Sequence, residues 1–332
     1  MKENLRKEPI RVGGLTLRNR LVMPPMATEH STGEGKVTDA LIRYYEDKAE
    51  DRAIGLIITE HSWILPEGRA SAGQMSLASD TVIPKLRELT DAIHAYDTPV
   101  FAQLNHAGGA ARESITGFPP VGPSAAMLPR RKAPSEPPTA MSIEQIREVI
   151  EAFAAAAGRA VSAGFDGVEI HSAHGYLLNQ FYSPLTNRRE DAYGGSLENR
   201  IRIHREVIRA VRAAIGPGIP LAVRLGGCDY VAGGSEIRDC VEACRIFAED
   251  GVDLLDLSGG MCCYTRNDTE EPGYFRDMST AVKQAVSVPV LLTGGVTTGK
   301  QMEMLLREGC ADLIGVGRTI LKDSHCAKNI MQ

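Results

Sequence analysis

Short apolar runs alternate with longer amphipathic runs along most of the chain. Each apolar run has the length of a strand that is buried on both faces. We expect eight such strands, at residues 20–23, 54–59, 100–104, 167–170, 221–225, 253–257, 290–293 and 313–316. Helical patterns are expected at residues 39–51, 142–163, 196–215, 236–250, 277–286 and 298–308, with a last helix after Arg318.

Eight strands in alternation with helices predict an α/β protein built as a (β/α)8 TIM barrel. The rival fold, a doubly wound sheet, usually has a glycine-rich first turn. Here the first strand leads instead into Met23-Pro24-Pro25-Met26. Because no linker or low-complexity tract interrupts the alternation, we expect residues 1–332 to form a single domain.

Two segments fall outside the bare barrel pattern. Residues 10–17 contain a Gly13-Gly14 turn between apolar residues, which predicts a hairpin that caps the barrel bottom. Residues 105–141, after the third strand, are rich in proline and glycine. Loops of this length in compact domains are usually lids or binding loops.

Composition narrows the classes of partner. The 332 residues carry a net charge of −5, with no strongly basic run, so nothing indicates nucleic acid or anionic lipid. No apolar stretch approaches the roughly 18–20 residues of a membrane span. Residues 1–8 are charged and lack an apolar signal core, and the seven cysteines form no CxxC motif. We therefore expect a cytoplasmic protein with reduced thiols.

The fourth strand ends with His171, His174 and Tyr176, at the barrel face where active sites lie. A metal site would need a third ligand, which the spacing does not supply, so we expect no metal. The histidines could also be satisfied structural residues of a wet loop. We favour a pair of hydrogen-bond donors to a substrate oxygen, with Tyr176 as a nearby proton source.

Other strands carry polar residues at the same face. Gln103 has an amide donor and acceptor, which suit the edge of a flavin pyrimidine ring or a neighbouring loop. Arg224 lies in an apolar strand, where it needs an acid, a phosphate or an electron-rich ring as a partner.

Glycines end the seventh and eighth strands. Gly294 and Gly295 follow one strand, while Gly317 and Arg318 follow the other, and this pattern predicts a phosphate site. Residues 294–300 nearly match a P-loop, but Gln301 replaces the required Ser or Thr, which argues against a nucleoside triphosphatase.

Three segments, residues 19–26, 171–178 and 183–200, resemble the Old Yellow Enzyme family of NADH:flavin oxidoreductases. The last one, which runs SPLTNRREDAYGGSLENR, is a near-complete copy of the family's long loop. The resemblance covers about residues 9–328, and the chain looks like a single-domain relative of 2,4-dienoyl-CoA reductase. Cys326 stands alone near the last residue given, so we expect no iron–sulfur cluster.

The resemblance implies an ene-reductase with FMN as cofactor. NADH or NADPH would reduce FMN, whose N5 would pass hydride to the β-carbon of an α,β-unsaturated carbonyl compound. Gln103 would bond the pyrimidine edge and Arg224 would lie beside N1. His171 and His174 would polarise the substrate carbonyl, and Tyr176 would give a proton to the α-carbon. The FMN-binding residues would be Pro25, Met26, Ala27, Gln103, Arg224, Gly295, Gly317 and Arg318.

This sequence departs from the family pattern at several positions. Ala27 stands where relatives often carry Cys or Thr near the flavin O4. His61 stands where a small residue is common, and we expect it to reach the flavin or narrow the pocket. Tyr264 follows the sixth strand and is expected to shape the substrate pocket. The adjacent Cys262 and Cys263 allow a redox role, but two reduced thiols packing a loop are the simpler interpretation.

Two other functions fit the same barrel. One is oxidative demethylation or dehydrogenation of amines, for which a cation cage would be needed, yet the sequence has a single tryptophan, Trp63. The other is flavin binding without turnover, against which the set of His171, His174 and Tyr176 argues. The resemblance also favours a homo-oligomer acting on a small molecule.

Overall fold

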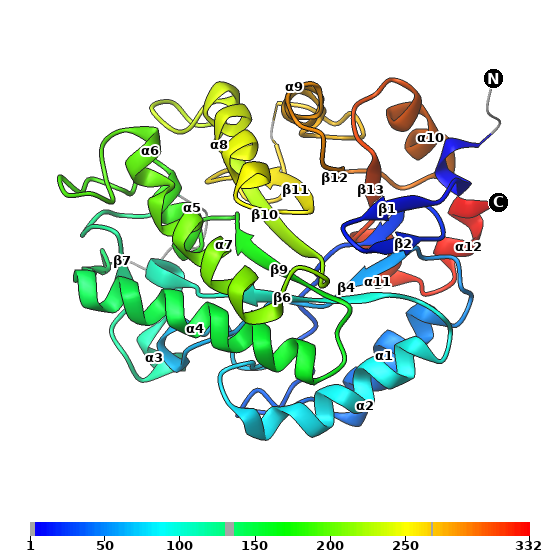
Figure 1. Ribbon diagram of the computed structural model, residues 1–332, viewed down its shortest axis with the longest axis horizontal. Helices are drawn as coiled ribbons and strands as arrows, with labels where there is room; N and C mark the ends of the chain where they lie inside the picture. The colour runs from blue at the N-terminus through cyan, green and yellow to red at the C-terminus, as the bar shows by residue number, and fades with distance from the viewer. Residues whose placement is uncertain (1–3, 130–135, 267) are drawn as a thin grey trace.

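The computed structural model describes residues 4–129, 136–266 and 268–332. Its centre is a closed barrel of parallel strands, with helices arranged around it (Figure 1). The barrel strands are β3 (Leu21–Met23), β4 (Leu56–Ile58), β6 (Val100–Asn105), β9 (Gly167–Ser172), β10 (Leu221–Cys228), β11 (Leu254–Gly259), β12 (Val290–Thr293) and β13 (Leu313–Gly315). The predicted (β/α)8 fold is confirmed.

Parallel strand pairing runs around the whole ring of strands and closes it. Each strand pairs in parallel with its neighbour, and β4 also pairs with β6 through Ile57 and Val100. The last strand, β13, returns to the first, β3, where Ile314 pairs with Leu21. A two-residue strand, β5 (Ser62–Trp63), extends the sheet beside the end of β6.

The lower barrel interior is apolar. One residue or two from each of seven strands fill it: Val22, Leu56, Ile58, Phe101, Ala222, Leu254, Leu291 and Leu313. The hairpin of β1 (Ile10–Val12) and β2 (Leu15–Leu17) packs Val12 and Leu17 against this cluster. The expected hairpin therefore closes the barrel at the amino ends of its strands.

Helices cover the outside of the barrel (Figure 1). The longer ones are α1 (Asp39–Ala49), α2 (Ile83–His94), α4 (Ile143–Ser162), α7 (Arg202–Ile215), α8 (Ile237–Glu249), α9 (Arg276–Ala285) and α10 (Gly299–Arg307). The shorter ones are α3 (Glu113–Thr116), α5 (Leu177–Tyr182), α6 (Leu197–Arg200), α11 (Arg318–Lys322) and α12 (Cys326–Met331). A capping box begins α4, since Ser142 and Gln145 bond each other's backbone N–H groups.

The sequence patterns missed one long helix, α2, and the short helices α3 and α5, and they merged two others. Helix α2 was not predicted, although Leu86, Leu89 and Ile93 form its buried face at helical spacing. The single helix expected over residues 196–215 is divided at Ile201, which links α6 to α7. Within the described part of the chain, no helix is long and apolar enough to span a membrane.

The long loop after β6 contains structure of its own. It holds a 3-10 turn, η4 (Gly108–Ala110), then α3, then β7 (Val121–Gly122), which pairs with β8 (Thr139–Ala140). Part of the expected lid, residues 130–135, lies outside the described residues.

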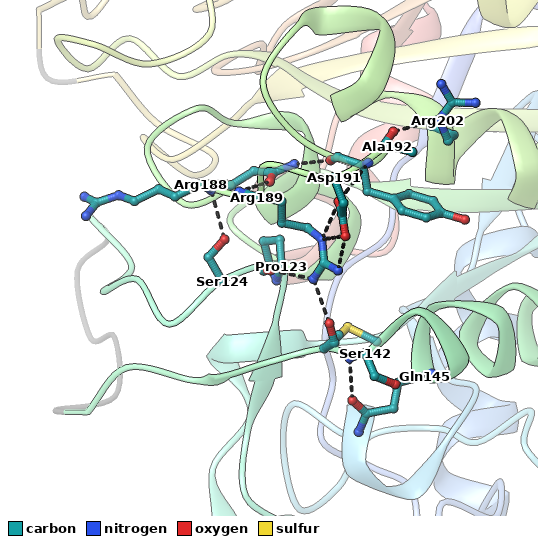
Figure 2. Close-up of polar contacts among 12 residues, drawn as sticks. Pro123, Ser124, Ser142, Gln145, Arg188, Arg189, Asp191, Ala192 and Arg202 are labelled. Carbon is teal, nitrogen blue, oxygen red and sulfur yellow. Dashed lines mark hydrogen bonds and ion pairs between the residues drawn. The ribbon is translucent and has the colours of Figure 1, made fainter.

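Arg189 joins this loop to the one between α5 and α6 (Figure 2). Its Nη1 donates to the carbonyl oxygens of Pro123 at 2.9 Å and Met141 at 2.7 Å. Its Nη2 donates to Asp191 Oδ2 at 2.6 Å, and the Arg188 backbone N–H donates to Ser124 Oγ at 2.9 Å. Two segments far apart in sequence are thus held together.

Candidate active site

A cavity of about 780 Å³ opens at the carboxyl ends of the barrel strands. Its volume is within the usual range for cofactor and substrate pockets. Every site residue predicted from the sequence lines it: Pro25, Met26, Ala27, His61, Gln103, His171, His174, Tyr176, Arg224, Tyr264, Gly295, Gly317 and Arg318. The barrel brings these residues together because parallel strands end on the same face.

One wall of the cavity is an aromatic cluster after β9. The His171 ring lies 5.3 Å from the His174 ring and 5.2 Å from the Tyr176 ring, each edge to face. Ser258 of β11 holds His174, with 2.7 Å between Oγ and Nε2. Tyr264 lies at the rim, with its ring 6.1 Å from that of His174 and 62% of the residue exposed.

The turn that presents this wall is conformationally costly. His174 has φ +62°, in the left-handed backbone region that residues other than glycine rarely adopt. Asn179 Oδ1 accepts the next N–H, that of Gly175, at 2.7 Å. Gln180 Nε2 donates to Gly175 O at 2.7 Å and to Ala107 O at 3.1 Å. These buried amides from α5 fix the turn and tie it to the loop after β6.

The cavity floor rests on two buried acids. Gln103 Nε2 donates to Glu169 Oε1 at 2.8 Å, and Arg224 Nε lies 3.1 Å from Asp256 Oδ2. Both acids have no exposed surface. Among the partners considered for Arg224, the structure supplies an acid. Sequence reasoning missed both acids, although each is a charged residue inside an apolar strand.

The two acids do not share the cation equally. Burial raises the pKa of Glu169 well above its ordinary value, and the negative charge of Asp256 raises it further, while Arg224 opposes both effects. Burial also raises the pKa of Asp256, against the nearby Arg224 charge. Because Asp256 contacts the guanidinium and Glu169 contacts only an amide, we assign the retained proton to Glu169.

The floor has the donor and acceptor set that a flavin ring needs. Gln103 Oε1 is buried and has no hydrogen-bond partner within the protein. Arg224 Nε is buried too and, despite its ion pair, makes no aligned hydrogen bond. Such groups are costly unless a ligand satisfies them. They fit the polar edge of a bound ring.

The far end of the cavity fits a phosphate. Gly295 has φ +72°, and a Cβ there would lie 2.5 Å from Tyr274 Cε1. A Cβ on Gly317 would lie 2.8 Å from Met26 Sδ, so a side chain at either glycine would collide with a residue that lines the cavity. Arg318 Nη2 donates to Tyr274 Oη at 3.3 Å, at the same end. A glycine cradle with an adjacent cation is suited to the phosphate of FMN.

The adjacent cysteines lie beside the substrate wall. Cys263 lines the cavity, and neither Cys262 nor Cys263 forms a disulfide. Burial raises the pKa of Cys262 to about 12, which keeps it a thiol at neutral pH. Over the described residues, no group of three or more His, Cys, Asp or Glu could hold a metal ion.

Known proteins resemble this chain over most of its length. The NADH:flavin oxidoreductase / NADH oxidase family matches residues 7–332. The NADH oxidase of Thermoanaerobacter brockii is 37% identical over 324 residues, which are 96% of this chain and 49% of that protein. The chain thus spans about half the length of that relative.

Two further proteins match over nearly their whole length. The NADPH dehydrogenase of Halalkalibacterium halodurans is 40% identical over 315 residues, covering 95% of this chain and 90% of that protein. The structure of an old yellow enzyme homologue from Zymomonas mobilis superposes with a TM-score of 0.86 at 29% identity. The superposition covers 98% of this chain and 92% of the Zymomonas mobilis chain.

Proposed function

The chain belongs to the NADH:flavin oxidoreductase / NADH oxidase family, whose cofactor is FMN, and on that premise we propose that it is an NAD(P)H-consuming ene-reductase. Its substrates would be α,β-unsaturated carbonyl compounds, reduced at the activated C=C bond. The observation that carries the proposal is the joint placement of His171, His174 and Tyr176 on one wall of a cavity whose floor is Gln103 and Arg224.

The residues that would hold FMN divide between the ring and the phosphate. Gln103 would offer its unpartnered Oε1 to the pyrimidine edge, and Arg224 would place its cation beside N1. Gly295, Gly317 and Arg318 would hold the phosphate, and the backbone of Pro25, Met26 and Ala27 would run along the ring. FMN bound there would accept hydride from NADH or NADPH and pass it to the substrate.

The aromatic wall would bind the substrate and manage its charge. His171 and His174 would donate hydrogen bonds to the carbonyl oxygen, where negative charge develops as hydride arrives. Ser258 holds the His174 ring, which reduces the motion that such a donor would otherwise have. The Tyr176 hydroxyl would deliver a proton to the α-carbon. Tyr264, at the rim, would bound the pocket and contact the substrate.

An anaerobic visible spectrum tests the proposal. The bound flavin should bleach with NADH or NADPH and recover with 2-cyclohexenone or a steroid enone. Recovery with oxygen alone would reject the substrate class, and bleaching by an amine in place of nicotinamide would favour the amine dehydrogenase. A flavin that nicotinamide does not bleach would favour a binding protein.

Tyr176→Phe separates the two half-reactions. We expect bleaching by nicotinamide to keep its rate, because Tyr176 has no part in that step. Recovery with an enone should slow by roughly 10²–10⁴-fold, the usual effect of losing a positioned proton donor. Equal slowing of both steps would mean that Tyr176 shapes the flavin site and is not the proton source.

The proposed assembly and location follow from the family resemblance and the cysteines. We propose a homo-oligomer that acts on small molecules in the cytoplasm, because the family resemblance and the reduced cysteines favour it. Light scattering of the purified protein would reject this assembly if the mass in solution were that of one 35.8 kDa chain.

A further inference from the structure

The amide of Gln74 is held in one orientation behind the cavity wall. Its Oε1 accepts the Ala70 backbone N–H at 2.7 Å, and a backbone N–H can only donate. The other end of the amide must therefore be the Nε2 group. Nε2 lies 3.0 Å from the His61 carbonyl oxygen and 2.6 Å from His61 Nδ1, so its two hydrogens serve these two acceptors.

This arrangement fixes the tautomer of His61. Because Nδ1 accepts a hydrogen bond, it carries no proton, and the neutral ring must carry its proton on Nε2. The pKa of His61 is lowered to about 4, mainly by burial and to a smaller degree by the Arg224 charge. Glu29 and the His61 backbone oppose this shift. The ring is thus neutral across the physiological pH range.

The protonated edge of His61 faces the cavity. His61 lies between β4 and β5 and lines the cavity, whereas Gln74 is 3% exposed and does not line it. Since Nδ1 is directed at Gln74, the opposite edge with Nε2–H is the one turned toward the cavity. The His61 ring lies 5.4 Å from that of Tyr176 and 6.0 Å from that of His171, so it borders the substrate wall.

We propose that His61 is a fixed, neutral hydrogen-bond donor of the active site, and that Gln74 is the positioning residue that sets its tautomer. The Nε2–H would serve a carbonyl or anionic oxygen of the bound ligand, either of the flavin ring or of the substrate. This assignment rests on the proposed function only for the identity of that ligand. The tautomer follows from contacts within the protein.

The tautomer is tested on the protein itself by ¹⁵N NMR of histidine-labelled samples. We expect His61 to show an unprotonated Nδ1 and a protonated Nε2, with no titration between about pH 5.5 and 8.5. A protonated Nδ1, or titration in that window, would overturn the proposal. This result does not depend on substrate turnover, so it remains decisive even if enones prove not to be substrates.

Gln74→Glu replaces the amide group that donates to His61 Nδ1 with a carboxylate that can only accept. A carboxylate beside Nδ1 would draw a proton onto it and raise the pKa of His61, because the ring would gain a charged acceptor. NMR should then show Nδ1–H in the variant. Gln145→Glu, in the capping box of α4, is the matched control, since Gln145 does not line the cavity and its change should leave His61 unaltered. Loss of the Nε2–H tautomer in both variants would contradict a role specific to Gln74.

His61→Phe identifies which ligand, the flavin or the substrate, accepts the hydrogen bond from His61 Nε2–H. It keeps an aromatic ring but removes the donor, so the ligand affinity concerned should fall roughly tenfold. A weaker FMN Kd of the apoprotein with an unchanged KM for 2-cyclohexenone assigns the bond to the flavin. The reverse assigns it to the substrate. Unchanged values of both would overturn the proposal. If His61→Phe does not fold, the same two measurements are made on Gln74→Glu at a pH above the raised pKa of His61, where the neutral ring carries its proton on Nδ1 and lacks the Nε2–H donor.

Discussion

At the scale of single residues, the charge of the cavity floor depends on where one proton lies. Arg224 is the cation closest to two buried carboxyl groups, Asp256 in direct contact and Glu169 through the electrostatic field. With Glu169 protonated, the charges of Arg224, Asp256 and Glu169 sum to zero. With both acids ionised the floor would be negative, which would oppose an anionic ligand above it.

Glu169→Gln tests this assignment through the pH dependence of stability. The pKa of Glu169 is raised in the folded state, so its contribution is present at low pH and is lost as pH rises above its unfolded value toward its folded value. The wild-type protein should therefore lose stability relative to Glu169→Gln as the pH rises above 4.5, the ordinary pKa of a glutamate. Urea unfolding of both proteins at a fixed FMN concentration measures the difference.

Asp256→Asn is the contrasting variant. It leaves the Arg224 guanidinium buried beside a neutral amide, which typically costs about 3–5 kcal/mol. We expect this loss at every pH where Asp256 is ionised. If Glu169→Gln and the wild-type protein showed the same dependence on pH, the proton would not lie on Glu169.

Residue types at strand ends were predictable, and their partners were not. Gln103, Arg224 and the two histidines follow from the rule that barrel sites lie at the carboxyl ends of strands. Glu169, Asp256 and Gln74 could not be assigned in the same way, because each acts on a residue from a different segment. Their pairing depends on strand register and loop path, neither of which leaves a local pattern in the sequence.

At the scale of secondary-structure elements, the phosphate end depends on glycines between strands and helices. Gly295 follows β12 with φ +72°, and Tyr274 lies against it. The same positive φ occurs at Gly309, after α10, where a Cβ would meet nothing within 4 Å. The two positions therefore share the backbone strain but differ in their surroundings.

Gly295→Ala should weaken FMN binding, with Gly309→Ala as its control. Both should lose on the order of 1 kcal/mol of stability, because alanine is strained at positive φ. Only Gly295→Ala should also force Tyr274 to move, and we expect its FMN Kd to rise at least about tenfold. Titration of each apoprotein with FMN measures this. Equal Kd values for the two variants would exclude crowding at Tyr274 as the cause.

Helix patterns were predictable where the apolar face was continuous and capped. The capping box of α4 marked its start, and the helix begins there. Helix α2 was missed although its buried face has regular spacing, and its Pro84 lies in the first turn, where proline is tolerated. The division at Ile201 has no glycine or proline to mark it, and Ile201 itself keeps a right-handed helical backbone with φ −90° and ψ 0°.

At the scale of the whole molecule, the barrel itself was predictable and the joining of its loops was not. The alternation of buried strands and amphipathic helices repeats along the chain, so many segments support the same fold. The contact of Arg189 with Pro123 and Met141 joins segments that no periodicity relates (Figure 2).

Arg189→Lys tests how far this joint stabilises the two loops that it connects. Lysine cannot reach two carbonyls and Asp191 in the same fork, so we expect a stability loss of about 2 kcal/mol. Faster proteolysis within residues 117–129 should accompany it. Arg188→Lys is the control, because only the Arg188 backbone N–H holds Ser124. A similar loss in both variants would mean that the side-chain fork of Arg189 adds nothing specific.

The junction of β3 with β13 has a consequence for how the protein assembles. It brings together the first and last strands of the barrel, so its closure carries the largest loop entropy and should come late in folding. The proposed FMN site lies across this seam, where Met26 faces Gly317. Bound FMN would then stabilise the pairing of β3 with β13. Its removal should speed amide hydrogen exchange in β3 and β13 more than in β9 and β10.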